Sequence, residues 1–391
     1  MAEFGCLCSE VLLARNAWEK RKLGEVITLT GGGTPSKKVH KYWHGSINWL
    51  SSQEIKGRFV HKGTYQITEE AIKNSATKLI EKNTPLFVYR SGILAHRFPI
   101  ALTTQRVAIN QDIKAMIFDH NRIVPQFLVS ELQSQESFIL HNIVKTGTTV
   151  QSVAVADFLK MPFLFPQYDE QNRVAIFLDF VETLIAATQH RIDTLEHVKK
   201  ALLQHVLDQS WRFKGFTDHW KRHKISDIFR VTRGKVLPTS SVANQKSLAT
   251  PFPVYSSQTK HDGLLGYYHD YLYADAITWT TDGANAGMVK YRPQKFYSTN
   301  VNGVLISTQG YANTAVASIL NTIAWKYVSH VGNPKLMGKV MADISLELPS
   351  IPEQKALSSL LENLNNTIRT TNVKLSKIQL LKSSLLQQLF I

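Results

Sequence analysis

The chain has 391 residues, of which 43% are hydrophobic, and its formal net charge at pH 7 is +15. This length predicts two or three domains, and the hydrophobic content excludes a generally disordered protein. The charge is concentrated in the second half, because residues 1–209 carry 24 basic and 20 acidic side chains whereas residues 210–391 carry 21 and 10. Such an excess favours a polyanionic partner, most commonly nucleic acid, over a basic surface without a ligand.

Residues 1–17 have no predicted role. They hold both cysteines, Cys6 and Cys8, which are too close together for an ordinary framework disulfide and too few for a structural zinc site. The acidic Glu3 and Glu10 argue against a signal peptide, and no apolar run reaches the roughly 18 residues of a membrane helix. We therefore expect a cytoplasmic protein that does not enter a membrane.

Residues 18–165 form the first predicted globular block. Residues 79–80, 86–89 and 113–117 read as short strands between Gly, Pro and Asn, and residues 126–140 read as a helix. The opening phrase WEKRKLGEVI, from Trp18, returns as WKRHKISDIF from Trp220. The repeat therefore extends beyond the long helices described next.

Residues 166–210 form a predicted long helix with one narrow apolar seam, since its apolar residues recur mostly at steps of 3, 4 and 7. The run from Val174 to Val206 spans roughly 50 Å at about 1.5 Å per residue. A helix of this length with a narrow seam needs a partner. The side chains predicted to pair are Val181, Ile185, Ile192, Leu195, Val198 and Leu202.

Residues 211–347 form the second predicted block, which is richer in Tyr, Thr and Gly. Residues 270–273, 276–279 and 303–306 are strand-like, and residues 314–329 read as a helix. The two blocks share order and approximate size but little sequence. Two globular inserts that diverge on a repeated frame suggest two readers of different targets.

Residues 348–391 form a second long helix, which matches the first at a constant offset of 183 without a gap. Pro166 aligns with Pro349, and Glu170-Gln171 aligns with Glu353-Gln354. The predicted pairing residues are Leu364, Ile368, Leu375, Ile378, Leu381 and Leu385. The two helices predict an antiparallel or side-by-side coiled coil within the chain, rather than two separate core helices. The predicted fold is α+β, with two α/β domains separated by two paired helices in a pseudo-twofold internal repeat.

These features resemble the specificity subunit of type I restriction-modification systems over about residues 18–391. The phrases that carry the resemblance are TGGGTPSKKVHKYWHGSINWLSSQEI from Thr30, the Asn110-Gln111-Asp112 turn, the two Pro…Glu-Gln helix starts and WRFKGFTDHWKRHKISDIF from Trp211. One departure is that residues 9–17 do not match residues 211–219, so the lead-in of the first domain is altered.

The resemblance implies two target-recognition domains that each read one half of a split, asymmetric sequence in double-stranded DNA. It also implies that the helices set the spacing and carry two methyltransferase (modification) subunits, onto which restriction subunits assemble. The chain itself would be non-catalytic and would hold no cofactor. S-adenosylmethionine, and ATP with Mg²⁺ for restriction, would bind on the partner subunits.

The residues show no catalytic or metal motif. The glycine segment from Thr30 to Ser36 lacks the P-loop string, so we expect a tight turn at positive φ, with phosphate contact as the alternative. The 14 histidines do not cluster at metal spacing, and Asn333-Pro334-Lys335 and Arg292-Pro293-Gln294 fail as adenine methyltransferase motifs. An enzyme with an unrecognised site and a coiled-coil interaction protein remain the alternatives.

The candidate DNA contacts are hydrogen-bonding side chains in loops of the two blocks, since Arg and Lys address guanine, and Asn and Gln address adenine. In the first block they are Thr34, Ser36, Lys37, Lys38, Lys41, Gln53, Arg58, Arg90, Arg97 and Gln111. In the second block they are Arg233, Lys235, Gln258, Lys260, Asn285, Lys290, Arg292 and Lys295.

Overall fold

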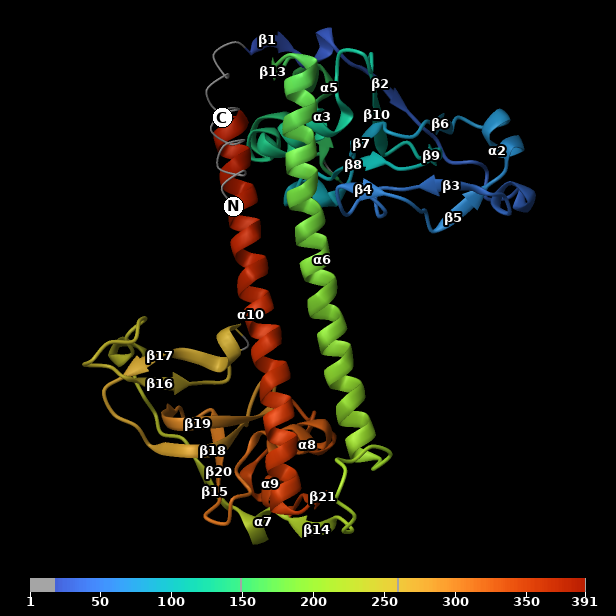
Figure 1. Ribbon diagram of the computed structural model, residues 1–391. Coiled ribbons are helices and arrows are strands. Elements are labelled where there is room, and N and C mark those ends of the chain that lie inside the picture. The colour runs from blue at the N-terminus through green and yellow to red at the C-terminus, as the bar shows by residue number, and fades with distance from the viewer. Residues whose placement is uncertain (1–17, 148–149, 259, 391) are drawn as a thin grey trace. The chain divides into compact units, whose positions relative to one another are not determined.

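The computed structural model describes residues 18–147, 150–258 and 260–390, without the side chain of Lys260 (Figure 1). Residues 1–17, singled out above, lie outside the described residues. The chain divides into a first unit, residues 1–189 with 373–391, and a second unit, residues 190–372. Both boundaries fall inside long helices, so each unit contains a globular block and a part of each helix. In the described ranges no helix is long and apolar enough to cross a membrane.

The first unit contains a five-stranded sheet of order β2-β10-β7-β8-β4 and a four-stranded sheet of order β5-β3-β9-β6. Its elements in chain order are β1 (Glu19–Lys22), η2 (Leu23–Glu25), β2 (Thr28–Gly31), η3 (His40–Trp43), β3 (Ile47–Leu50), β4 (Phe59–Val60), β5 (Tyr65–Ile67), α2 (Glu69–Lys73), β6 (Lys78–Ile80), β7 (Pro85–Val88), η4 (Gly92–Ala95), β8 (Ile100–Thr103), β9 (Val107–Ile109), β10 (Ile113–Ile117), α3 (Pro125–Ser134), α4 (Glu136–Phe138), η5 (Ile139–Ile143), β11 (Val144–Lys145), β12 (Ser152–Val153), α5 (Val155–Leu159), β13 (Pro162–Phe165) and the start of α6 (Tyr168–Leu207).

The second unit contains a six-stranded sheet of order β15-β20-β18-β19-β16-β17. After the end of α6 its elements are β14 (Lys221–Lys224), α7 (Ile225–Ile228), β15 (Arg230–Arg233), η6 (Thr239–Ser241), β16 (Phe252–Tyr255), η7 (Lys260–Gly263), β17 (Leu264–Tyr268), β18 (Tyr273–Thr280), β19 (Val289–Ser298), β20 (Asn302–Ile306), α8 (Thr314–Ala324), η8 (Trp325–Tyr327), α9 (Gly338–Asp343), β21 (Ser345–Leu348) and the start of α10 (Ile351–Phe390).

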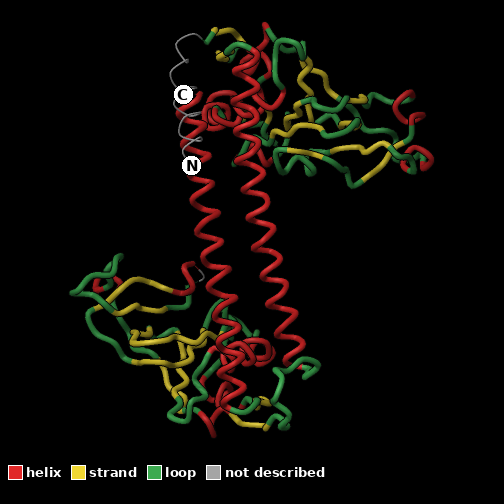
Figure 2. Tube along the Cα trace, in the orientation of Figure 1, coloured by secondary structure: helices red, strands yellow, loops and turns green. Residues whose placement is uncertain are grey.

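The two units repeat one strand topology, although their sequences differ. In the first, β10 pairs antiparallel with β2 and β7, and β3 lies parallel to β9. In the second, β20 pairs antiparallel with β15 and β18, and β16 lies parallel to β19. In each unit the first strand also pairs antiparallel with the last strand before a long helix. These pairs are β1–β13 and β14–β21. The distribution of strands and helices can be followed in Figure 2.

Three predicted elements differ from the structure. The helix expected over residues 126–140 ends at Ser134, and a short helix and a π-turn follow it. The helix expected over residues 314–329 ends at Ala324, where its last turn tightens into η8. The strand expected over residues 270–273 begins only at Tyr273, the first residue of β18. The Asp270 carboxylate accepts a hydrogen bond from the Tyr271 backbone N–H (2.7 Å), and this local bond competes with strand pairing.

The long helices present a heptad seam in both units. Its side chains, all buried or half-buried, are Val174, Leu178, Val181, Ile185, Thr188, Ile192, Leu195, Lys199, Leu202 and Val206 in α6, and Leu357, Leu361, Leu364, Ile368, Thr371, Leu375, Ile378, Lys382, Leu385 and Leu389 in α10. The steps alternate between four and three residues, which is the 3.5-residue period of a coiled coil. Each position of α10 lies 183 residues after its counterpart in α6.

The helices run antiparallel within each unit. In the first, Trp18 hydrogen-bonds Glu170 near the start of α6 and contacts Phe390 at the end of α10. In the second, Val206 near the end of α6 shares a core with Leu357 near the start of α10. The predicted pair is thus antiparallel in both units.

Two predicted seam residues, Val198 and Leu381, are wrong. They are 49% and 52% exposed, and the heptad places Lys199 and Lys382 at the seam instead. A lysine covers the seam with its aliphatic stem while its ammonium reaches the rim. In the first unit that ammonium, on Lys382, forms an ion pair of 2.5 Å with Glu182.

Candidate nucleic-acid interface

The glycine segment of the first unit allows two backbones to approach closely. A Cβ on Gly32 would lie 1.9 Å from the Ile109 carbonyl oxygen, and a Cβ on Gly33 would lie 2.7 Å from Ala76. None of Gly31, Gly32 and Gly33 adopts a positive φ, so the predicted left-handed turn is wrong. Glycine is needed here because β2 continues directly over the end of β9, where the Gly33 N–H donates to Ile109 (3.0 Å).

This crossing brings together three predicted contact residues that are distant in sequence. The Thr34 hydroxyl donates to the Gln111 side-chain oxygen (2.8 Å), and the Gln111 amide donates to Asp112 (3.3 Å). Arg90 pairs with the same carboxylate (3.0 Å). Thr34, Arg90 and Gln111 are all exposed. The result is a row of exposed donors and acceptors held in one orientation, as base-edge or phosphate recognition requires.

Lys114 lies beside this row and was missed by the sequence analysis. Its ammonium lies 5.0 Å from the centre of the Tyr89 ring, and it is the nearest group to a Cβ placed on Gly31. It belongs to β10, in which Ile113 and Ala115 face the core. Strand alternation was the signal that could have found it.

The loop after the glycines presents Ser36, Lys37 and Lys38, all exposed. Two tryptophans fix the backbone of this loop, since the Trp49 indole N–H donates to the Gly33 carbonyl (3.0 Å) and the Trp43 indole N–H donates to the Ser36 carbonyl (3.2 Å). The remaining first-unit candidates are not part of this loop or of the row. Lys41 forms an ion pair with Glu70 (2.5 Å), while Gln53 and Arg97 are exposed on other turns.

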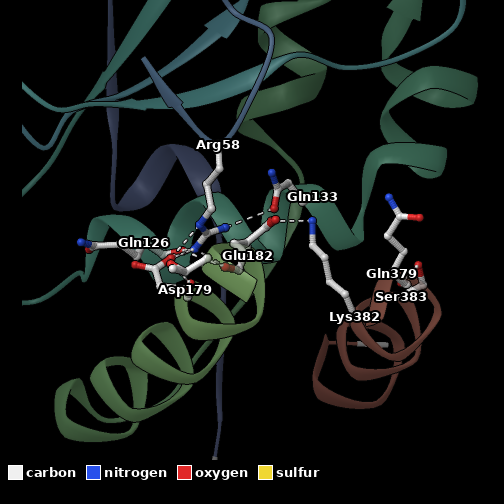
Figure 3. Close-up of polar contacts among 10 residues, drawn as sticks. Arg58, Gln126, Gln133, Asp179, Glu182, Gln379, Lys382 and Ser383 are labelled. Atoms are coloured by element: carbon white, nitrogen blue, oxygen red, sulfur yellow. Dashed lines mark hydrogen bonds and ion pairs between the residues drawn. The ribbon is translucent and has the colours of Figure 1, made fainter. Parts of the chain in front are cut away.

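Arg58 was predicted as a DNA contact, but it is a buried structural residue. Its guanidinium forms an ion pair with Asp179 of α6 (2.7 Å) and donates to Ser130 (2.9 Å) and Gln133 (3.2 Å) of α3 (Figure 3). Burial and, to a smaller extent, the Glu182 charge raise the pKa of Asp179, although Arg58 opposes the shift. Arg58 therefore ties the first block to the long helix and is not available to DNA.

In the second unit, the equivalent crossing follows β15. A Cβ on Gly234 would lie 2.1 Å from the Thr299 carbonyl oxygen, as Gly32 does over Ile109. The preceding residue, Arg233, is exposed, donates to the Asn300 carbonyl (2.5 Å) and lies 3.8 Å from Asp282. Asp282 opens the predicted turn that contains Asn285, and Lys335 reaches it from another loop (3.9 Å).

Arg292 is the second correction. It is buried, stacks 3.8 Å from the centre of the Tyr255 ring and pairs with Asp262 (3.0 Å). Burial lowers the pKa of Arg292, and Asp262 opposes that shift. Lys290 pairs with the same carboxylate, so both cations stabilise the fold around η7.

Each of the other second-unit candidates has its own surroundings. Lys235 is exposed after the crossing, and Lys295 lies 4.5 Å from the centre of the Tyr271 ring. The Gln258 amide donates to the Leu264 carbonyl. The side chain of Lys260 is outside the described residues. Among described side chains, no group of three or more His, Cys, Asp or Glu could hold a metal ion.

Comparisons with known proteins follow the same division of the chain. Residues 16–197 and 217–380 match the family model described as type I restriction modification DNA specificity domain. The EcoR124I/EcoR124II specificity subunit of Escherichia coli is 37% identical over 167 residues, which cover 42% of this chain and 41% of that protein. The MjaIX specificity subunit of Methanocaldococcus jannaschii is 21% identical over 403 residues, covering 95% of this chain and 92% of that protein.

The fold is similar to a solved structure. The crystal structure of the type I restriction-modification S subunit from M. genitalium has a TM-score of 0.71 to this chain. It covers 96% of both chains at 17% identity, so the likeness shows a common fold. The chain thus shares its fold along almost its whole length, whereas its match to the E. coli relative spans less than half of that relative.

Proposed function

Because this chain belongs to the type I restriction-modification DNA specificity family, we propose that it binds a bipartite, asymmetric target in double-stranded DNA. The first unit would contact one half of the target through the row Thr34–Gln111–Arg90 and the loop with Lys37 and Lys38. The second unit would contact the other half around Arg233 and Asn285. Each set lies next to the glycine crossing of its own unit.

One observation carries the proposal: the two units repeat a strand topology while their exposed loops differ. Two residues after its crossing glycine the first unit has Thr34 and the second has Val236, and the exposed Lys235 takes the place of Gly33. A common frame with different exposed polar groups suits two half-sites of different sequence. An excess of 15 positive charges suits a phosphate backbone as the partner.

The partners follow from the same family membership. Two methyltransferase subunits would bind the chain, restriction subunits would assemble on them, and S-adenosylmethionine and ATP with Mg²⁺ would bind on those partners. The chain would then position DNA without catalysing a reaction. Each long helix has 40 residues, or roughly 60 Å at about 1.5 Å per residue, which exceeds the 34–36 Å of one DNA turn.

Selection from a random-sequence duplex pool tests the proposal directly. The full chain, alone and with its modification subunits, should enrich two short sequence blocks separated by a fixed gap. Binding should weaken with salt at a slope of about 0.9 per phosphate contact. A pool that stays unenriched, together with a flat salt dependence, would favour a coiled-coil interaction protein. Methyl transfer by the chain alone would instead indicate an enzyme with an unrecognised site.

Two constructions test the division of labour. Replacing residues 211–347 by those of another family member should change only one block of the target. Deleting residues 190–196 and 373–379 removes one heptad from each helix and preserves the seam. Each helix then becomes roughly 10 Å shorter. The gap should then shorten by about three base pairs at 3.4 Å each, while both blocks keep their sequence. A deletion that changed the bases themselves would contradict independent readers.

A further inference from the structure

The segment from Trp325 to Met337 in the second unit exposes apolar side chains that no structural role explains. Val331 is 92% exposed and Trp325 is 62% exposed, and Tyr327 and Met337 are exposed as well. Single exposed apolar residues are common on protein surfaces, but four of them lie within these thirteen residues. The Trp325 indole N–H already donates to the Thr322 carbonyl (2.9 Å), so a ligand would contact the faces of the indole ring.

The backbone holds this segment as a closed loop. Ser329 and Lys335 exchange two hydrogen bonds, of 2.8 and 3.0 Å. Gly332, with φ of +74°, turns the chain at the tip beside Val331. The loop is anchored through Leu336, which is fully buried and whose carbonyl accepts the Trp279 indole N–H (2.9 Å). A closed and anchored loop presents its tip without a large ordering cost on binding.

The loop adjoins the candidate interface of the second unit. The Gly283 N–H, within the glycine-rich turn, donates to the Pro334 carbonyl (2.9 Å). Asp282 lies between Lys335 (3.9 Å) and Arg233 (3.8 Å), so its charge is compensated from both sides. The exposed apolar tip is therefore continuous, through Lys335 and Asp282, with Arg233, which is proposed above to contact DNA.

The charge of this segment favours DNA over a protein as its binding partner. The thirteen residues contain no Asp or Glu, and they contain Lys326 and Lys335, both exposed. Lys326 lies 6.0 Å from the centre of the Trp325 ring, so a cation and an aromatic face are presented together. Aromatic and apolar side chains flanked by lysines suit contact with bases between phosphates.

We propose that Trp325–Met337 is a DNA-contacting loop of the second unit. Val331 and Trp325 contact bases, through a thymine methyl group or an exposed base step, and Lys326 and Lys335 neutralise phosphates. This inference rests on the proposed function and adds apolar residues that determine specificity to its polar contacts. It assigns a part of the sequence recognition in the second half-site to side chains that form no hydrogen bond with a base.

The test uses the full chain with its modification subunits and a random-sequence duplex pool. Val331→Ala and Trp325→Ala should each lower affinity for the enriched duplex by roughly tenfold, because each substitution removes one apolar or stacking contact with a base of the bound duplex. Sequence preference should weaken at positions of one half-site alone. Lys326→Ala should weaken enriched and random duplexes equally and reduce the salt slope by about one.

Leu248→Ala, at an exposed aliphatic residue of the second unit outside this loop and outside the long helices, is the matched control and should leave DNA affinity unchanged. Unchanged affinity and preference in both Val331→Ala and Trp325→Ala would overturn the loop assignment while the proposed function stands. Loss of modification-subunit binding with unchanged DNA affinity would identify the loop as a protein-docking surface. If the wild-type complex enriches no duplex, the proposed function fails first.

Discussion

The starts of the two long helices show what the repeat keeps and what it changes. Gln171 and Gln354 have the same role, since each donates to the carbonyl of the proline five residues earlier, at 3.1 and 2.8 Å. Each also accepts a hydrogen bond at the N-cap of a core helix, from the Val124 N–H (3.0 Å) and the Asn313 amide (2.9 Å). The glutamine thus connects the long helix to the core helix α3 or α8 in both units.

The neighbouring glutamates differ in their partners. Glu170 accepts the Trp18 indole N–H (3.0 Å), whereas Glu353 is held by both arms of Arg212, at 3.0 and 2.6 Å. Trp220, which occupies the place of Trp18 in the repeat, has a buried indole nitrogen without a hydrogen-bond partner. With its acceptor taken by Arg212, the second unit retains the tryptophan only for packing. At this position the repeat therefore keeps the tryptophan while its hydrogen bond to the glutamate is lost.

The largest contrast should lie between the seam and the residue beside it. Ile378→Asp places an unpaired carboxylate in the buried seam and should lower the free energy of unfolding by about 3–5 kcal/mol. Leu381→Asp, at an exposed position three residues later, should change it by less than about 0.5 kcal/mol. Denaturant unfolding of both variants measures the difference, and equal losses would refute the heptad described above.

A second contrast concerns Glu131 in α3, whose place in α8 is taken by the fully buried Leu320. Burial raises the pKa of Glu131 well above its ordinary value near 4.5, although the Leu164 N–H partly opposes this, and one carboxyl oxygen has no hydrogen-bond partner. Above pH 4.5 the unfolded chain releases this proton while the folded chain keeps it. The free energy of unfolding should therefore fall as pH rises through that window.

Glu131→Gln removes this titration while preserving shape. The variant should match the wild type near pH 4.5 and exceed it at pH 8 by roughly 1–3 kcal/mol, the cost of an unsatisfied buried group. Thermal or urea unfolding across this pH range is the measurement. Parallel pH profiles of the two proteins would show that Glu131 is ionised in the fold. No such difference is expected for Leu320→Met, a size-matched change at the equivalent site.

The paired tryptophans sharpen the comparison at the helix starts. Trp18→Phe and Trp220→Phe remove the same volume, but only the first removes a hydrogen bond, to Glu170. Trp18→Phe should therefore cost about 1 kcal/mol more of the free energy of unfolding than Trp220→Phe. Urea titration of the two variants gives this difference, and a larger loss in Trp220→Phe would mean that its N–H has an unrecognised partner.

The smallest expected effect concerns the seam lysines. Lys382 pairs with Glu182 in the first unit, whereas the matching position in the second unit is Asn365, which lines a cavity of about 610 Å³ together with Lys199. Asn365→Glu should give Lys199 a carboxylate and add up to about 1 kcal/mol at low salt. A double-mutant cycle with Lys199→Met isolates the pair. Coupling that is zero at low salt would place the two side chains out of reach.

The sequence alone determined the repeat, because a seam at a period of 3.5 residues is a one-dimensional signal that survives substitution. The helix starts at Pro166 and Pro349 and the family resemblance rest on short local phrases, and comparing two such phrases gives the offset of 183. These were sufficient for two α/β blocks on paired helices. The crossing at Thr34 and Gln111 was also foreseeable as two separate loops, though not as one site.

Only the tertiary structure decided which charged side chains are available to DNA. Arg58 and Arg292 are indistinguishable from Arg90 in sequence, yet both are buried. Arg58 is buried against a carboxylate partner, Asp179, that lies 121 residues away in the sequence, and burial by so distant a partner leaves no local pattern. The tertiary structure also decided the exposure of Val198 and Leu381, because packing places the adjacent lysine at the seam and leaves the apolar residue exposed to solvent.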